Sequence, residues 1–515
     1  MTGYLLLAIA AVVVLVLGLI ALYDLTQRKH AVLRVFPIIG HLRYLLEGIG
    51  PELRQYIVTD NDSERPFSRD ERRWVYTSAK ARDTYFGFGT DNDIERSPGY
   101  VIIKQAAFPA TDAPQFGAGA QHWLPMAKVL GRARGRVHQR RLNSVVNISS
   151  MSYGSLSSAA VTALNRGAAL AECVQGSGEG GVTSYHRHGG ELIWQIGTGY
   201  FGCRDAQGRF DHDAFHRTLA ENPQIVGVEI KLSQGAKPGL GGVLPAPKVT
   251  REIAAIRGVA VGVDCVSPAG HSAFHDADSL LDFVEHVAED TGLPVGIKSA
   301  VGDLAFFEQL AHHMQPRTRG VDWITIDGGE GGTGAAPLAF ADYVALPFML
   351  GFARVYATFA RAGLTDDVVF LGAGRLGLPQ RALQAMALGC DGVNVGREAM
   401  LAIGCIQAQR CHTGRCPTGV TTNQPWRMRG LDPADKSVRC ATYIGQLRKE
   451  LTQLARACGV AHPALVTAEQ FEQLDDGLRA RTLREIVGYE PGWGRPSAVD
   501  VAALFSLAAP TPGGE

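Results

Sequence analysis

The sequence predicts an α/β protein whose main domain is a (β/α)8 TIM-type barrel, preceded by an N-terminal transmembrane helix and a lead-in subdomain. Three features predict this architecture: an uncharged apolar run, short β-branched segments alternating with helical ones, and glycine-rich motifs after most of those segments. The expected boundaries are an anchor with its basic flank at 1–30, the lead-in subdomain at 31–143, the barrel at 144–455 and a C-terminal helical tail at 456–515.

The apolar run YLLLAIAAVVVLVLGLIALY, residues 4–23, is long enough to cross about 30 Å of hydrocarbon as a helix. A signal peptide is one alternative, but no basic side chain precedes the run and no convincing cleavage site follows it. A displaced helix of a soluble protein is another. Arg28, Lys29, His30 and Arg34 follow the run, and by the positive-inside rule they are expected to keep the downstream chain in the cytoplasm. We expect a single-pass protein of the cell membrane with a cytoplasmic catalytic domain.

The composition is that of a globular enzyme. Of 515 residues, 46% are hydrophobic and 19% are charged, which excludes a disordered chain. Lys plus Arg and Asp plus Glu number 50 each, so the charge balance gives no support to a nucleic-acid partner, which favours a basic excess.

Short apolar runs recur from residue 144, with helix-like stretches between most of them, whereas residues 31–143 show no strong period. Such alternation is typical of parallel βαβ units with strands buried on both faces. Eight or nine candidates fit a closed barrel better than an open sheet. The candidate strands are SVVNIS (144–149), LAECV (170–174), LIWQI (192–196), IVGVEIK (225–231), VAVGVDC (259–265), PVGIK (294–298), VDWITID (321–327), VVFLG (368–372) and DGVNV (391–395).

Glycine-rich or polar motifs follow nearly every predicted strand, at the end where a barrel builds its active site. For any single loop, glycines that merely turn the chain are the alternative. The loops GAGRLG (372–377) and NVGREA (394–399) end the last two strands, which is the usual phosphate-binding position of a barrel. No Rossmann glycine fingerprint follows a first strand, so a nicotinamide domain is unsupported and the sequence suggests FMN.

Lys231 and Lys298 each end an apolar strand, where an unpaired buried ammonium is costly. One interpretation is a salt bridge inside the barrel. The other is a positive charge beside the flavin pyrimidine edge, which stabilises the anionic reduced form. Gln234 and Lys237 lie in a glycine-rich loop and are expected to reach toward a substrate, and Glu179 in GSGEGG faces the same cavity.

The segment CIQAQRCHTGRCPTGV contains Cys405, Cys411 and Cys416. Zinc at a structural site prefers four protein ligands, for which Cys440 or His412 would be needed. Disulfides are rare in a reducing compartment. Iron–sulfur clusters are commonly held by thiolates of one compact loop with a proline after the last cysteine, and three thiolates suit a three-iron cluster. Three buried structural cysteines remain the alternative.

Five segments together resemble the FMN-binding synthase domain of glutamate synthase over residues 145–455: MSYGSLS, GSGEGG, KLSQGAKPGLGG, DGGEGGTGAAP and CIQAQRCHTGRCPTGVTTNQ. The resemblance implies that ammonia and 2-oxoglutarate condense to 2-iminoglutarate, which reduced FMN converts to L-glutamate. It also implies that Cys405, Cys411 and Cys416 hold a [3Fe-4S] cluster.

The same resemblance assigns residues to the two sides of the site. Glu179, Gln234 and Lys237 fall on the substrate and catalytic side, and Arg257 becomes a candidate partner for a 2-oxoglutarate carboxylate. The candidate cofactor-binding residues are Ser152, Lys231, Lys298, Gly328, Gly329, Gly331, Gly332, Gly334, Gly374, Arg375, Gly396 and Arg397.

The sequence departs from the full-length synthase in ways that bear on its partners. No cysteine precedes Cys173, so the catalytic cysteine of an N-terminal glutaminase is lacking, and no nicotinamide or FAD domain is recognisable. We expect free ammonia or a separate glutaminase, and an external electron donor such as ferredoxin or a reductase subunit. The alternatives are a related flavin synthase that makes an N-substituted glutamate from another amine, and a non-catalytic electron-relay subunit at the membrane.

Overall fold

The computed structural model describes residues 2–85, 87–111, 122–477 and 479–508. The chain divides into two compact units, Met1–Arg72 and Arg73–Glu515. The division falls inside the predicted lead-in subdomain, so residues 31–72 belong to the N-terminal unit and the remainder of that subdomain belongs to the barrel unit.

The N-terminal unit is helical. It contains α1 (Thr2–Thr26), α2 (Ala31–Val35), α3 (Gly40–Leu53) and the π-helix η1 (Arg54–Val58). The predicted apolar helix is therefore present. Among the described residues, Gly3–Thr26 is the one helix long and apolar enough to cross a membrane, a property that a signal sequence or a helix of a soluble protein can share. Its one charged side chain, Asp24, is buried, accepts the Ile38 N–H at 2.9 Å and lies 3.0 Å from His41 Nε2.

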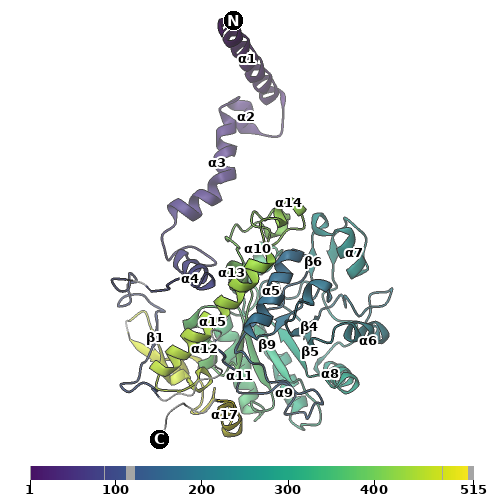
Figure 1. The fold of residues 1–515 in the computed structure, drawn as a ribbon, viewed down its shortest axis with the longest axis vertical. Helices are drawn as coiled ribbons and strands as arrows, with labels where there is room; N and C mark the ends of the chain where they lie inside the picture. Colours follow the sequence, from purple (N-terminus) through teal and green to yellow (C-terminus); the bar gives the residue numbers. More distant parts are fainter. Residues whose placement is uncertain (1, 86, 112–121, 478, 509–515) are drawn as a thin grey trace. The chain divides into compact units, whose positions relative to one another are not determined.

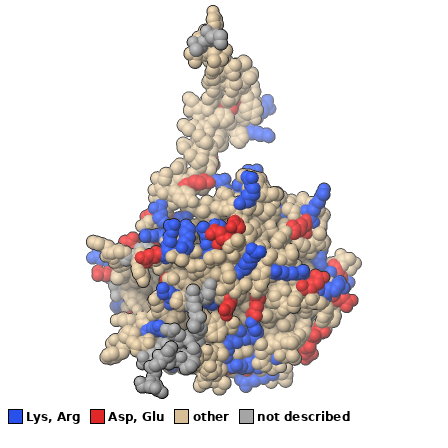
Figure 2. Space-filling view, in the orientation of Figure 1, with Lys and Arg blue, Asp and Glu red and all other residues tan. Residues whose placement is uncertain are grey.

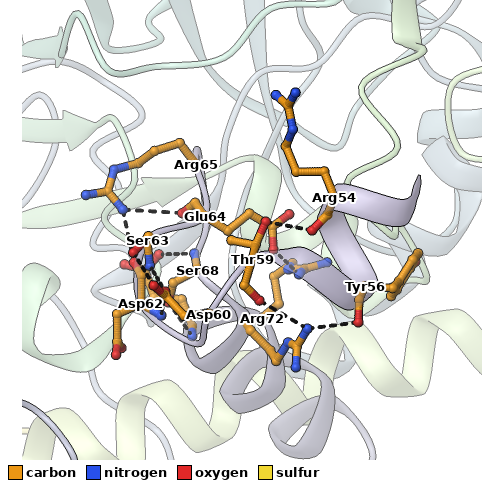
Figure 3. Close-up of polar contacts among 12 residues, drawn as sticks. Arg54, Tyr56, Thr59, Asp60, Asp62, Ser63, Glu64, Arg65, Ser68 and Arg72 are labelled. Atoms are coloured by element: carbon orange, nitrogen blue, oxygen red, sulfur yellow. Dashed lines mark hydrogen bonds and ion pairs between the residues drawn. The ribbon is translucent and has the colours of Figure 1, made fainter. Parts of the chain in front are cut away.

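The end of this unit is held by local polar contacts (Figure 3). The Thr59 hydroxyl donates to the Arg54 carbonyl at 2.7 Å and closes η1. Asp60 accepts the Ser63 hydroxyl at 2.6 Å and the Ser63 N–H at 2.7 Å, and these bonds lower the pKa of its carboxyl group. Arg72 pairs with Glu64. The segment between η1 and α4 (Arg69–Ala79) is thus ordered by bonds within itself.

Eight parallel strands of the second unit close into a barrel in the order β10-β11-β2-β3-β4-β5-β8-β9, which confirms the predicted fold class. The strands are short, and nearly all of their residues are buried, as near-continuous apolar runs require. They are β2 (Val146–Ile148), β3 (Gln175–Gly176), β4 (Leu192–Ile196), β5 (Ile225–Lys231), β8 (Val295–Ser299), β9 (Trp323–Asp327), β10 (Val369–Ala373) and β11 (Gly392–Val395).

Two of the nine candidate strands differ from the prediction. LAECV lies mostly in helix α5 and its turn, because the helix runs to Ala171 and ends with Glu172 in the left-handed region at φ +50°; strand β3 follows at Gln175. VAVGVDC is wrong as a barrel strand. Most of it is exposed, with Val261 54% and Val263 55% accessible, and only its last residue enters β7 (Cys265–Val266).

Strand β7 pairs antiparallel with β6 (Val243–Leu244) in a two-stranded sheet outside the barrel. Both lie in the excursion between β5 and β8, which also carries η3 (Ala246–Lys248) and α7 (Arg251–Arg257). The alternating small and apolar residues of VAVGVDC carry the local pattern of a strand, but burial inside a barrel is a tertiary property that this pattern does not specify.

Helices surround the barrel in the second unit (Figure 1). They are α5 (Ser158–Ala171), α6 (His212–Ala220), α8 (Ala277–Thr291), α9 (Ala305–Met314), α10 (Leu338–Tyr343), α11 (Phe348–Arg361), α12 (Pro379–Ala387), α13 (Arg397–Ala402), α14 (Pro425–Met428) and α15 (Pro433–Ala457), with the 3-10 turns η2 (Ser184–His186), η4 (Cys411–Thr413), η5 (Pro463–Leu465) and η6 (Ala468–Gln470). Helix α15 packs closely on α5, since a Cβ added at Gly167 would lie 2.7 Å from Cys440 Cβ.

The C-terminal region is not only helical, as the sequence had suggested. Strands β12 (Phe471–Leu474) and β13 (Ala480–Thr482) form a small antiparallel sheet with β1 (Val101–Ile103), followed by α16 (Leu483–Val487) and α17 (Ala498–Phe505). This sheet joins the lead-in region to the end of the chain. Figure 2 shows Lys and Arg interspersed with Asp and Glu over one face of the barrel unit, in line with the balanced composition.

Candidate active site

Three predicted site residues meet at the carboxyl end of β5. Lys231 Nζ lies 2.7 Å from Glu179 Oε1, and it donates to Gln234 Oε1 at 2.6 Å. Lys231 ends β5, Glu179 lies in the loop after β3, and Gln234 lies in the loop that follows Lys231. One ammonium group thereby joins the loops after β3 and β5, the two strands on either side of β4, as expected where the ends of parallel strands gather.

The charges around Glu179 keep its carboxyl group ionised. Burial raises the pKa of this group, but the opposing effects of Lys231, Lys237 and Arg257 outweigh burial, so that its pKa is lowered. A charged carboxylate at this position accepts hydrogen bonds and holds the surrounding cations in place.

Lys237 is buried, with 4% of its surface accessible, and it forms no ion pair within 4.0 Å in the described part of the chain. Burial lowers the pKa of its ammonium group; Glu179 opposes that change and Lys231 adds to it, and the net effect is a lowered pKa. Burial of an ammonium without a close ion-pair partner carries a desolvation cost, which Glu179 offsets only in part. An anionic ligand beside Lys237 would remove that cost.

Close backbone approach fixes the loop that carries Gln234 and Lys237. A Cβ added at Gly235 would lie 1.8 Å from the Gly328 carbonyl oxygen, so a side chain there would separate the loops after β5 and β9. The glycines of KLSQGAKPGLGG therefore include one with a packing role at the rim.

His271 completes this part of the site and was not predicted. Its Nε2–H donates to the Lys231 carbonyl at 2.9 Å, and its Nδ1 accepts the Tyr200 hydroxyl at 3.0 Å. Burial is the main cause that lowers the pKa of His271. The ring is therefore neutral near pH 7 and its orientation is set by two partners. The motif SPAG directly precedes it in the chain, which is the one sequence signal that could have singled it out.

Lys298 at the end of β8 lies 3.3 Å from Asp327 Oδ2 at the end of β9. Burial lowers the pKa of Lys298, but Asp327 and the buried carboxylate Glu229 outweigh burial and raise it. Glu229 itself accepts from Gln195 Nε2 at 2.7 Å and from the Thr325 hydroxyl at 2.6 Å. Both strand-end lysines are thus paired inside the barrel, as the salt-bridge interpretation expected.

The loops after β9, β10 and β11 approach one another through glycines. Gly374 has φ +126°, and a Cβ added there would lie 3.2 Å from Gly328 N. A Cβ at Gly332 would lie 2.5 Å from Arg397 Cδ, and Arg397 donates to the Glu330 carbonyl. The three loops are thus in close contact, through backbone between Gly374 and Gly328 and through the Arg397 side chain at Gly332.

The remaining rim residues differ in how crowded they are. Added Cβ atoms at Gly329 and Gly331 would meet the Ala345 carbonyl at 2.8 Å and the Gly328 carbonyl at 2.9 Å. In contrast, the nearest neighbours of an added Cβ at Gly334 and Gly396 are 3.9 Å and 3.5 Å away.

Two other predicted residues lie beside the Glu179 loop. A Cβ added at Gly178 would lie 2.3 Å from Ser152 N, so the loops after β2 and β3 are in contact. Arg257 donates to the Tyr153 carbonyl at 3.0 Å, and its guanidinium carbon lies 5.1 Å from the Phe201 ring centroid. Part of its donor capacity is thus already used within the protein.

The cysteine segment forms the turn around η4, after α13. All nine cysteines of the chain lie in the described residues and all are free thiols. Cys416 is buried; burial raises the pKa of its thiol, but hydrogen bonds from the Thr418 and Thr421 groups outweigh burial and lower it. A thiolate is the form that binds metal.

Lys248, which was not predicted, reaches this segment from η3. It donates to the Ser155 carbonyl at 2.7 Å and to the Cys411 carbonyl at 3.4 Å. Its positive charge lies near both Cys411 and Cys416. Burial lowers the pKa of Lys248 and the two cysteines oppose that effect, and the net result is a pKa of about 8. Cys440, one possible fourth ligand, is instead fully buried between α5 and α15, and burial raises the pKa of its thiol.

Comparison with known proteins gives the family. Residues 128–461 match the conserved region in glutamate synthase. The chain belongs to the glutamate synthase family. As a member of that family it is an oxidoreductase of the kind that acts on CH–NH2 donors.

The alignment with this chain covers nearly all of one relative and only part of another. This glutamate synthase family member is 36% identical over 487 residues to the glutamate synthase large subunit-like protein YerD of Bacillus subtilis, covering 88% of this chain and 92% of that protein. It is 34% identical over 325 residues to the archaeal glutamate synthase [NADPH] of Methanocaldococcus jannaschii, covering 62% of this chain and 60% of the relative. The chain therefore spans less than two thirds of the archaeal protein.

Among solved structures, a flavocytochrome b2 variant with sulfite bound aligns over 91% of this chain and 98% of its own, with a TM-score of 0.43 and 14% identity. That similarity is too low to bear on function. The barrel of this glutamate synthase family protein rests on its own strand pairing.

Proposed function

We propose that this protein is an FMN- and [3Fe-4S]-dependent glutamate synthase that reduces 2-iminoglutarate, formed from 2-oxoglutarate and ammonia, to L-glutamate. The observation that carries the proposal is the Lys231–Glu179–Gln234 cluster next to Lys237, a buried cation without an ion-pair partner among the described residues. An electron relay has no need for such a cation in a polar loop.

Lys237 is proposed to bind a carboxylate of 2-oxoglutarate. The substrate carries two negative charges, and one of them would supply the missing partner of the buried ammonium. Gln234 presents an amide whose oxygen is held by Lys231, which leaves its NH2 group to donate toward the substrate. Arg257 donates a weak hydrogen bond to Cys265 Sγ at 3.8 Å. We assign Arg257 a longer-range charge interaction with the second carboxylate of 2-oxoglutarate.

Glu179 is proposed to handle protons during imine formation. Addition of ammonia to the ketone and loss of water require a base and then an acid near the same carbon. The carboxylate is ionised, is held by Lys231 at 2.7 Å and faces the charge of Lys237. Transient protonation of Glu179 would weaken its pairing with Lys231, so proton transfer and lysine orientation are coupled.

The residues at the rim fit FMN. At Gly334 and Gly396 an added Cβ would have only van der Waals neighbours, at 3.9 Å and 3.5 Å, and Gly374 has a φ that side chains rarely adopt, so these glycines allow a ligand to lie close to the backbone. Arg375 and Arg397 would supply charge for the phosphate, and Lys298 would lie on the pyrimidine side. When bound, FMN supplies the two-electron reduction of the imine.

The electrostatic surroundings of the cysteine segment support the proposal of a three-thiolate cluster. Hydrogen bonds from threonines lower the pKa of Cys416, and Lys248 places a positive charge near Cys411 and Cys416. Both effects favour thiolates over thiols. Cys405, Cys411 and Cys416 would hold the [3Fe-4S] cluster, whose chemistry is to pass single electrons from an external donor, ferredoxin or a reductase subunit, toward the flavin.

We further propose that α1 anchors the protein in the cell membrane with the barrel in the cytoplasm, and that ammonia arrives free or from a separate glutaminase. Isolated protein with a chemical reductant and 2-oxoglutarate should then form glutamate from ammonium and not from glutamine. Turnover on glutamine that an ammonia-scavenging enzyme cannot suppress would contradict this source.

The test of the main proposal is a turnover assay with photoreduced protein, 2-oxoglutarate and ammonium, and L-glutamate as the measured product. A parallel assay replaces ammonium with a primary alkylamine. Glutamate in the first assay supports the proposal. Product in the alkylamine assay alone would assign the protein to N-substituted glutamate synthesis, and no product in either assay would favour an electron relay.

A further inference from the structure

A cluster of possible metal ligands lies on the outside of the barrel, on helices α6 and α8. His212 and His216 are four residues apart on α6, so their side chains lie on the same face of the helix. Asp290 lies in the last turn of α8. These helices precede β5 and β8, which are neighbours in the barrel, and Figure 1 shows the two helices side by side.

The ligand atoms of the three side chains converge. Asp290 Oδ2 lies 2.5 Å from His216 Nε2 and 2.9 Å from His212 Nε2, and the two Nε2 atoms are 3.3 Å apart. All three atoms lie within 4.8 Å of one another. The Nε2 atoms of two imidazoles and one carboxylate oxygen thus converge, and all three are atoms that can coordinate a metal ion.

The spacing agrees with tetrahedral coordination. Metal–nitrogen distances of about 2.0–2.1 Å place two ligand nitrogens roughly 3.4 Å apart. The observed separation of the Nε2 atoms is 3.3 Å. Of these three atoms only the Asp290 oxygen would need to move, roughly 0.4 Å farther from His212 Nε2 and roughly 0.8 Å farther from His216 Nε2, to complete the same geometry.

A candidate for a fourth ligand lies on α8, outside the group of three converging atoms. His286 lies four residues before Asp290, one turn back on the same helix face, and its ring centroid is 5.6 Å from that of His212. Each helix thus carries a pair of candidate ligands at a spacing of four residues, in HDAFH and HVAED.

Aromatic packing holds both helices in position. Phe215, between the two histidines of α6, is fully buried and stacks on Trp194 with ring centroids 5.1 Å apart. Phe210, just before α6, lies 5.0 Å from the ring of Phe283 on α8. The ligands therefore stand on packed helices rather than on loops, which favours a preorganised site.

We propose that His212, His216, His286 and Asp290 bind a divalent first-row transition metal ion, Zn²⁺ above all, which joins α6 to α8. Imidazole nitrogens with one carboxylate oxygen are ligands that zinc accepts at four-coordinate sites. The site is separate from the cysteine segment in both sequence and ligand chemistry, and it requires no part of the proposed reaction.

The test is calorimetric titration of the anaerobically purified full-length protein, in detergent and after treatment with a chelator, with Zn²⁺. One binding event should be present in the wild type and in Cys411→Ser. It should weaken by at least tenfold to a hundredfold, the loss known for even an outer-shell partner of a metal, in His212→Ala and in His216→Ala. His313→Ala is the matched control, because His313 pairs with Asp278 at 3.6 Å without a second histidine bound to that carboxylate.

Two further measurements separate the proposal from a plain ion-pair network. Zn²⁺ should raise the Tm of the wild type and not that of His216→Ala, since a metal bound only by the folded state stabilises it. Co²⁺ bound at the site should give visible ligand-field bands without sulfur-to-cobalt charge transfer. Equal zinc affinity in the wild type and in both α6 variants, or loss of binding only in Cys411→Ser, would overturn the proposal. Unchanged affinity in His286→Ala would remove His286 from the ligand set.

Discussion

At the scale of single residues, Lys237 is the side chain whose surroundings say most about a ligand. It is buried, its pKa is lowered, and no ion-pair partner accompanies it in the described chain. Lys231 and Lys298, in contrast, each have a carboxylate partner, Glu179 and Asp327. The sequence predicted Lys231 and Lys298 at strand ends and Lys237 in a substrate-side loop, but only the tertiary contacts show that the first two are paired and that Lys237 is not.

We expect Lys237→Ala to raise the KM for 2-oxoglutarate by roughly tenfold to a hundredfold, the loss of a charge-assisted contact of about 1.5–3 kcal/mol. Flavin content should not change, because Lys237 is assigned to the substrate. Steady-state kinetics and the flavin absorbance of the purified protein check both statements. Lys104→Ala, which removes a lysine paired with Glu472 in the small sheet, serves as the control. Equal loss of flavin would make Lys237 structural.

Gly235 gives a second prediction at this scale. Its replacement by Ala would place a Cβ 1.8 Å from the Gly328 carbonyl oxygen, a distance that forces the two loops apart. Gly235→Ala should therefore lower both flavin content and turnover while the barrel remains folded. Gly239→Ala in the same loop, where nothing lies within 4 Å of the added Cβ, is the comparison, although its φ of +80° adds some local strain. Wild-type flavin content and turnover in Gly235→Ala would show that the loops can separate without cost.

At the scale of elements, most of the fold could be predicted because the strands carry their own signal. Seven of the candidate runs coincide with barrel strands, since buried parallel strands are apolar along their whole length. VAVGVDC has the same local pattern but is mostly exposed, and LAECV contains the last two residues of helix α5 and the turn that ends it. Local pattern does not encode which run the closed barrel will use.

The site was predictable to a similar degree. Residues set in glycine-rich motifs, such as Glu179 and Gln234, could be found because the motif and its place after a strand indicate a role together. His271 and Lys248 were missed because their importance comes from contacts with Lys231 and with the cysteine segment, which are far away in sequence. An isolated His or Lys in a loop carries no such signal.

The cysteine segment is an element whose chemistry can be tested directly. Anaerobically purified protein should contain about three irons and about one FMN per chain, as the three-thiolate assignment requires. Cys411→Ser should remove the iron and its absorbance while most of the flavin remains bound. Cys440→Ser is the matched control, because Cys440 packs between α5 and α15. Zinc in place of iron in the wild-type protein would refute the cluster assignment.

The short turn η5 gives a prediction on pH. His462 is fully buried; its Nδ1 accepts the Ala464 N–H at 3.1 Å and its Nε2–H donates to the Pro125 carbonyl at 3.1 Å. Burial lowers the pKa of His462 from 6.5 to about 4. Between these two pKa values the unfolded chain binds a proton at His462 and the folded chain does not. Neutral His462 therefore contributes up to about 3 kcal/mol to the free energy of unfolding above pH 6.5, and this contribution is lost as the pH falls toward 4.

This prediction is checked by the Tm measured against pH for wild type and His462→Asn. The variant should have a lower Tm at pH 7 and a shallower decline between pH 6.5 and 4. Some decline remains in both proteins, since His186 is also buried with a pKa lowered to about 4. His275→Asn, at a side chain that is 85% exposed, should leave the profile unchanged. Parallel profiles for wild type and His462→Asn would contradict the assignment.

At the scale of the whole molecule, the chain combines an oxidoreductase barrel with a helix suited to a lipid environment. Gly3–Thr26 is apolar, and the one charged residue within it, Asp24, is buried and accepts the Ile38 N–H inside the N-terminal unit. A buried, paired carboxylate at the end of the helix avoids the cost of an exposed charge near hydrocarbon. Arg28, Lys29 and Arg34 follow it, as expected on the cytoplasmic side.

We therefore expect the full-length protein to sediment with membranes and to resist extraction at alkaline pH, whereas protein lacking residues 2–30 should be released. The mass of the purified full-length chain decides between an anchor and a signal sequence, because a signal sequence would be removed and an anchor retained. A carboxyl-terminal reporter that works only in the cytoplasm should be active if, as we propose, the basic flank keeps the barrel on that side. An intact chain found in the soluble fraction would mean that α1 is covered by protein rather than by lipid, and a shortened chain would assign the segment to export.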